Sequence, residues 1–216
     1  MRFLLSALSL LTVATLSAAT PRAQPDVFDP RLGAPFEARD RPSVGSDKAA
    51  IVVVEFGSYK CSHCQEFLER VFPALNEKYI KTGKVQWFMT PASDDAADQN
   101  SRIFAIGRCV HRQGKFWESL GFLMKISNRP PSFLDDLVGR NPAINAGELA
   151  FCLQEREISQ SVARDFEEYR LMKVVGTPTF LIRRFNADGS RSETTVRGYQ
   201  PAEYFQRIFD ELSKVP

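Results

Sequence analysis

The chain has 216 residues, 44% of them hydrophobic and 25% charged, and its formal net charge is +2. These values are typical of a soluble globular protein with one sizeable core. The near balance of charge argues against nucleic acid as the main partner, because domains that bind it usually carry a clear excess of Lys and Arg.

The first 23 residues are predicted to be a signal peptide and leader. Arg2 supplies a positive start, residues 3–14 are mostly apolar, and the small residues Ser17-Ala18-Ala19 follow. This pattern is typical of a secretory signal, with cleavage expected near Ala19 or Ala23. The alternative is an uncleaved membrane anchor, although the apolar run is shorter than the roughly 20 residues that a spanning helix needs.

The next segments predict a strand, a helix and a second strand. Residues 20–45 are rich in Pro, Arg and Asp, and they predict an irregular leader with at most one short strand. The apolar, β-branched run 49–56 predicts a strand that is buried on both faces. A helix is expected over 65–82 from its apolar face, followed by a strand over 84–90. This order indicates a parallel pair of strands with a right-handed crossover.

A helical pattern continues from residue 94 to residue 173. Helices are expected over 96–111, 115–125, 132–138, 147–154 and 158–172. Six aromatic residues of this block are expected in the core: Phe104, Phe116, Trp117, Phe122, Phe133 and Phe151.

The last part of the chain predicts a hairpin and a closing helix. The strands are expected over 179–185 and 192–197, with a turn at 186–189. The helix is expected over 201–212. The order of all these elements predicts an α/β fold into which the helical block is inserted. This order also gives the expected domain boundaries. The first half of the α/β fold covers residues 24–92, the all-helical insertion covers 93–173, and the second half of the α/β fold covers 174–216.

Four cysteines allow three disulfide pairings. Because Cys61 and Cys64 are near neighbours, we favour the pairs Cys61–Cys64 and Cys109–Cys152, which suit an oxidising compartment. The second pair is interpreted as a structural staple. It is also compatible with a group that tunes the first pair, with a redox relay, or with two buried free thiols.

The segment Cys61-Ser62-His63-Cys64 lies between a predicted strand and a predicted helix. A helix N-terminus presents unpaired N–H groups and a positive dipole end, so a thiolate at Cys61 should have a pKa below its usual value of about 8.5. A charged His63 would add to this effect. Cys61 is therefore the expected nucleophile and Cys64 the expected resolving cysteine. Stabilising the Cys61 thiolate makes the disulfide a stronger oxidant.

Two other interpretations of this motif remain. A Cys-x-x-Cys pair can be half of a zinc site, but residues 110–151 separate the other two cysteines, and only His63 and His111 are available as histidine ligands. The pair could also be a purely structural disulfide. We expect neither a metal nor a cofactor.

Two further positions are candidates for the same site. Glu55 is a carboxylate inside an apolar run, and a buried acid has a raised pKa. It is interpreted as the proton acceptor that helps to deprotonate Cys64, the alternative being a glutamate that reaches solvent. If the Thr177–Pro178 bond is cis, Pro178 would lie beside Cys61, and the main chain of Thr177 could pair with an extended substrate. An ordinary trans turn is equally consistent with the sequence.

The segments VVVEFGSYKCSHC and VVGTPTF, separated by a helical block, resemble the DsbA-like branch of the thioredoxin superfamily. The resemblance covers about residues 49–212 and implies a thioredoxin fold with an inserted helical domain. It also implies Cys61 as nucleophile, Cys64 as resolving cysteine, Glu55 as buried acid and Pro178 as a cis-proline after Thr177. The chain departs from the best-known oxidases of this family at two positions of the substrate groove, where it has Ser62 instead of proline and Thr177 instead of valine.

The resemblance further implies a periplasmic enzyme that donates the Cys61–Cys64 disulfide to cysteines of unfolded exported proteins. A quinone-linked membrane oxidase of the DsbB type would then reoxidise it. Two other functions remain as alternatives. One is a disulfide isomerase or reductase, and the other is a thioredoxin-fold copper-binding or chaperone module that uses the two thiols as soft ligands.

Overall fold

The structure is a computed structural model that describes residues 27–29, 34–36, 41–92, 100–186 and 190–214. The expected signal segment over residues 1–23 therefore lies outside the described residues. A central sheet has the strand order β3-β5-β4-β6-β7. Its strands are β3 (Ser43–Val44), β4 (Ile51–Gly57), β5 (Val85–Pro91), β6 (Thr179–Phe185) and β7 (Arg191–Arg197).

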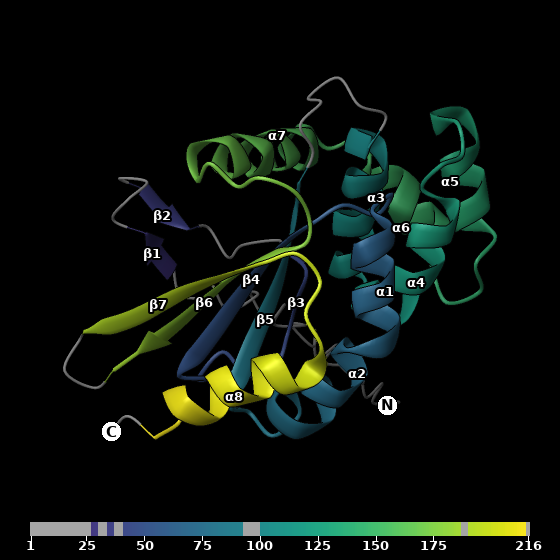
Figure 1. Cartoon of the computed structure of the whole chain (residues 1–216). Coiled ribbons are helices and arrows are strands. Elements are labelled where there is room, and N and C mark those ends of the chain that lie inside the picture. Colours follow the sequence, from purple (N-terminus) through teal and green to yellow (C-terminus); the bar gives the residue numbers. More distant parts are fainter. Residues whose placement is uncertain (1–26, 30–33, 37–40, 93–99, 187–189, 215–216) are drawn as a thin grey trace, which may run out of the picture.

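The sheet is mixed, and its central strands are covered on both faces. β4 pairs parallel with β5 and antiparallel with β6, and both β4 and β5 are buried along their whole length. Helices α1 (Ser62–Arg70), α2 (Phe72–Leu75) and α8 (Ala202–Leu212) cover one face, whereas α7 (Arg156–Leu171) lies over the other (Figure 1). This is an α/β fold with an inserted helical block, as the order of elements predicted, and it agrees with the thioredoxin fold that the resemblance implies.

The insertion forms a second layer of helices beside the sheet. It contains α3 (Asn100–Arg112), α4 (Phe116–Ile126), α5 (Pro131–Gly139), α6 (Ala146–Cys152) and α7. Its large apolar core extends to Tyr59 and Cys64, so the insertion contacts the Cys-x-x-Cys segment directly. The positions of the five expected helices are confirmed within a few residues for the described part of the chain.

Buried charges join the insertion to the sheet. The Arg41 guanidinium donates to Thr90 of β5 at 3.0 Å and forms ion pairs with Asp165, at 3.1 Å, and Glu168 of α7. Asp165 also pairs with Arg108 of α3. Because Arg41, Arg108 and Asp165 are almost fully buried, each charge depends on these partners to offset its loss of hydration.

The predicted leader and first helix differ from the structure in detail. Residues 20–45 were expected to hold at most one short strand. They contain a small hairpin of β1 (Val27–Asp29) and β2 (Ala34–Phe36), and also β3, which extends the main sheet at its edge. The helix expected over 65–82 is divided into α1, α2 and a π-helical turn, η1 (Asn76–Ile80). The division falls at Pro73, which lacks the N–H that would continue the α1 ladder.

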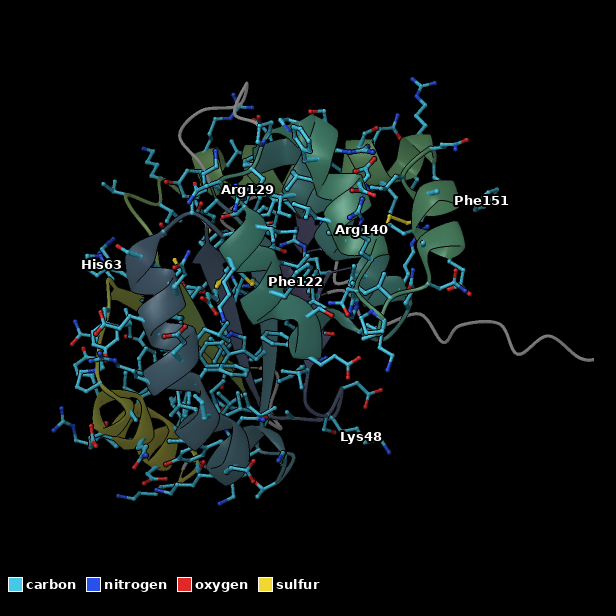
Figure 2. The ribbon with its side chains drawn as sticks, turned by 90° about the vertical axis from the view of Figure 1, so that its right-hand side faces the viewer. Lys48, His63, Phe122, Arg129, Arg140 and Phe151 are labelled. Carbon is cyan, nitrogen blue, oxygen red and sulfur yellow. A yellow bond between two sulfur atoms is a disulfide. The ribbon has the colours of Figure 1, made fainter. Side chains whose placement is uncertain are left out.

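The prediction that all six aromatic residues of the insertion lie in the core was wrong for two of them. Phe133 is 58% exposed and Phe151 is 72% exposed, and Figure 2 shows Phe151 at the outer edge of the molecule. Both lie on short helices, where Leu134 and Leu149 supply the buried contacts instead. Within the described ranges, no helix is both long enough and apolar enough to cross a membrane.

Candidate functional site

The site begins where β4 ends and α1 begins. Cys61 is the N-cap of α1, with φ −74° and ψ 118°, and its Sγ accepts a hydrogen bond from the Cys64 main-chain N–H at 3.3 Å. A cysteine sulfur here occupies the position in which a capping oxygen normally satisfies a free N–H of the first helical turn. The Cys61 side chain is half-buried, Cys64 is fully buried, and the two are free thiols in this structure.

The second part of the site comes from the loop before β6. The Thr177–Pro178 peptide bond is cis. In its protonated form the Cys61 thiol donates to the Thr177 carbonyl oxygen at 3.3 Å. The Gly198 N–H donates to the Pro178 carbonyl oxygen at 2.8 Å. The fold thus brings together residues separated by 116 positions in the sequence.

The environment shifts the pKa values of the Cys61 and Cys64 thiols in opposite directions. The pKa of Cys61 is lowered to about 5, first by a hydrogen bond from the Cys64 thiol and then by the Thr177 side chain and the N–H groups of Cys64 and His63. Partial burial opposes this shift. The pKa of Cys64 is raised well above its ordinary value by the bond to Cys61, by burial and by the charge of Glu55. At neutral pH Cys61 is therefore a thiolate and Cys64 a thiol.

Glu55 lies inside the sheet rather than at its surface. It is 5% exposed, and one carboxylate oxygen accepts a hydrogen bond from the Trp87 indole N–H at 2.9 Å. Burial raises its pKa to about 7, the indole opposes the shift, and the Cys61 charge adds to it. A carboxyl group with this pKa exchanges protons readily near neutral pH.

The His63 side chain points away from the two cysteines of the motif and into solvent. It is exposed at the start of α1 (Figure 2), and the contribution of residue 63 to the Cys61 pKa comes from its main-chain N–H. The other five expected site residues, Cys61, Cys64, Glu55, Thr177 and Pro178, come together at this end of the sheet.

Two buried residues of the site were missed by the sequence analysis. Trp87 reaches Glu55 because β5 lies beside β4, and the sequence carries no signal of that side-chain contact. Tyr59, just before the motif, is 2% exposed, and burial raises its pKa. A tyrosine so close to a Cys-x-x-Cys segment could have been noticed from its position alone.

The second cysteine pair is a disulfide. Cys109 of α3 and Cys152 of α6 are bonded, with an S–S distance of 2.04 Å, and both are buried in the core of the insertion. Among the described residues, no group of three or more His, Cys, Asp or Glu side chains is arranged to hold a metal ion.

Comparison with known proteins gives one family. The Thioredoxin family profile matches residues 37–199. A probable disulfide bond formation protein D from Bacillus cereus is 26% identical over 156 residues, which cover 68% of this chain and 72% of that protein. A putative protein-disulfide oxidoreductase from Rickettsia typhi is 27% identical over 146 residues, covering 64% of this chain and 53% of the relative.

Solved structures show the same fold. Wolbachia pipientis alpha-DsbA1 superposes with a TM-score of 0.67 at 23% identity, covering 81% of this chain and 91% of that one. Oxidised BdbD from Bacillus subtilis superposes with a TM-score of 0.64 at 20% identity, covering 82% and 94%.

Proposed function

The chain belongs to the thioredoxin family, and from that premise we propose that it is a DsbA-like, exported thiol–disulfide oxidoreductase that oxidises cysteines of other exported proteins. The observation that carries this proposal is the lowered Cys61 pKa at the N-terminus of α1. A stabilised thiolate favours the reduced protein, so the Cys61–Cys64 disulfide is readily given up.

The first step is attack on the disulfide. A substrate thiolate attacks Cys61 Sγ, a new S–S bond forms, and the Cys61–Cys64 bond breaks. Cys64 leaves as a thiolate and takes up a proton, since its pKa is strongly raised. Glu55, with a pKa of about 7, is the proposed proton donor, and it accepts the proton again when the disulfide is re-formed.

The second step releases the product. Another substrate thiolate attacks the substrate sulfur of the mixed disulfide, and Cys61 leaves as a thiolate. Its low pKa makes it a good leaving group. The substrate has then lost two electrons to the protein and two protons, of which one ends on Cys64 Sγ and the other passes to solvent, because Cys61 stays a thiolate. The main chain of Thr177 is the proposed pairing partner for the substrate segment next to its cysteine.

Other roles complete the proposal. Cys109–Cys152 acts as a structural staple for the insertion. The residue 1–23 segment directs export to the periplasm, and a quinone-linked membrane oxidase of the DsbB type accepts the two electrons from the reduced protein. The exported substrates are unfolded or partly folded chains with reduced cysteines.

The test is oxidative refolding of a reduced, unfolded secreted protein by the oxidised chain. We expect one substrate disulfide to form for each Cys61–Cys64 bond reduced, and the Cys61→Ser variant to form none. A redox equilibrium with glutathione separates the remaining candidates, because an oxidase has a more oxidising potential than a thioredoxin-like reductase. A reducing potential, or tight retention of copper by the two thiols during dialysis, would contradict the proposal.

A further inference from the structure

A small groove opens beside the cis-proline loop. Its floor belongs to the face of the sheet over which α7 lies (Figure 1). Its volume is about 90 Å³, far more than the roughly 10 to 15 Å³ that one water requires. Phe56, Thr179 and Leu181 form its floor, and Met172 and Val174 form its wall. The groove is therefore large enough to accept one aliphatic side chain against Leu181 and Val174, although polar groups also line it.

The rim of this groove is positively charged. Lys173, Thr195 and Arg197 complete the lining, which contains no carboxylate. Lys173 and Arg197 are exposed, and neither forms an ion pair with any residue that the structure describes. The groove thus combines an apolar floor with two cations that remain available to a ligand.

Lys173 occupies a position that geometry favours for glycine. It has φ +50° at the end of α7, where its N–H bonds the Arg170 carbonyl and the Val174 N–H bonds the Tyr169 carbonyl. This pattern of closure usually places glycine at the left-handed residue, because a Cβ is strained there. The Lys173 side chain therefore adds a positive charge to the rim of the groove, although the backbone conformation of this residue is strained.

The groove is continuous with the substrate contact of the site. Thr179 of its floor directly follows Pro178, and Val174 of its wall leads through Val175 to Thr177. Val175 is 79% exposed, so apolar surface continues from the wall toward the cis-proline. The groove lies on the face of the sheet opposite to α1 and α8, so it is a different surface from the helical wall beside Cys61.

We propose that this groove binds an acidic segment with an aliphatic anchor, located near the reactive cysteine of the polypeptide that is being oxidised. The inference rests on the proposed function and adds a substrate preference to it. The aliphatic side chain enters the cavity over Leu181, and flanking carboxylates pair with Lys173 and Arg197. Lys173 and Arg197 are thus specificity residues that do not touch the reacting sulfurs.

The test measures the second-order rate constants with which the oxidised full chain reacts with reduced cysteine peptides. One series carries Asp-Leu-Glu at several spacings on either side of the cysteine, and its matched series carries the neutral Asn-Leu-Gln. Each rate is divided by the rate with dithiothreitol, a neutral dithiol too small to reach the groove. For the best spacing we expect a preference of roughly threefold to tenfold for the acidic peptide, from two partly exposed ion pairs, and a decrease at high salt.

Three variants locate the effect. Lys173→Glu combined with Arg197→Glu should reverse the preference. Lys173→Gly should weaken it while raising the melting temperature, since the strained left-handed position is relieved; this separates binding from folding. Lys48→Glu reverses one positive charge at the far end of the sheet from His63 (Figure 2), half the charge change of the double variant, and should keep the preference.

The two proposals fail in different ways. Equal rates for acidic and neutral peptides at every spacing, with normal oxidation of both, would overturn the groove assignment and leave the oxidase function standing. A preference that survives the double charge reversal would overturn it as well. Failure to oxidise dithiothreitol and all peptides would overturn the proposed function, and the inference with it.

Discussion

The indole N–H of Trp87 donates to the carboxylate of Glu55 at 2.9 Å, across two neighbouring strands of the buried sheet. This contact opposes the desolvation that raises the Glu55 pKa to about 7. The balance between the two effects sets the pH at which the carboxyl group beside the dithiol changes its protonation.

Trp87→Phe should therefore raise the Glu55 pKa above 7, because the hydrogen bond to the charged form is lost while burial stays. Titration of the Glu55 carboxyl carbon by NMR measures this directly. Trp117→Phe is the matched control, since the Trp117 indole donates to the Ser43 carbonyl and not to a carboxylate. A Glu55 pKa that is unchanged or lower in the Trp87 variant would contradict the assignment.

Thr177→Val should raise the Cys61 pKa above about 5, because the Thr177 side chain is one of the groups that stabilise the thiolate. The Thr177 carbonyl and the cis-proline remain. The variant should also be a weaker oxidant, by about 30 mV for each ~1.4 kcal/mol of lost thiolate stabilisation. Thiolate ultraviolet absorbance against pH and a glutathione equilibrium measure the two quantities. Thr194→Val, on the exposed part of β7, should change neither.

The stability of the reduced protein relative to the oxidised protein should depend on pH. The folded Cys61 pKa is depressed from 9.0 to about 5, so the thiolate contributes stability that is fully present above the unfolded pKa and is lost as pH falls through 5. The disulfide form has no such group. The melting temperature of the reduced form, minus that of the oxidised form, should thus increase from pH 5 to pH 8.

A Cys61→Ala variant provides the control for this pH dependence, because it lacks the titrating thiol but keeps the other groups. Its melting temperature should differ little across the same pH range between a non-reducing buffer and a redox buffer that reduces Cys61–Cys64 in the wild type but leaves the buried Cys109–Cys152 bond intact. A reduced wild-type protein that loses stability relative to the oxidised form as pH rises would show that the thiolate is not stabilised.

Replacing both Cys109 and Cys152 by alanine should lower the free energy of unfolding by roughly 3 to 4 kcal/mol. The two residues are 43 positions apart, so the bond restricts a long loop in the unfolded chain. Urea unfolding measures the loss. If the bond is a staple, the Cys61 pKa of the variant stays near 5; a clear shift would instead favour the interpretation that this disulfide tunes the active site.

The local sequence determined the element types and the place of the motif. The apolar run at 49–56, the Cys-x-x-Cys segment after it and the amphipathic helix that follows are all encoded by neighbouring residues. Helix N-termini have the same free N–H groups wherever they occur, so a stabilised thiolate at Cys61 could be predicted without a tertiary structure.

Only the tertiary structure decided which distant groups surround that motif. Trp87 reaches Glu55 through the pairing of β4 with β5, and Thr177 reaches Cys61 through a cis bond and a chain reversal 116 residues later. The exposure of Phe151 was equally undecided, since a short helix can turn either side toward the core. Hydrophobic periodicity specifies which residues share a face, whereas strand pairing and helix docking specify what that face meets.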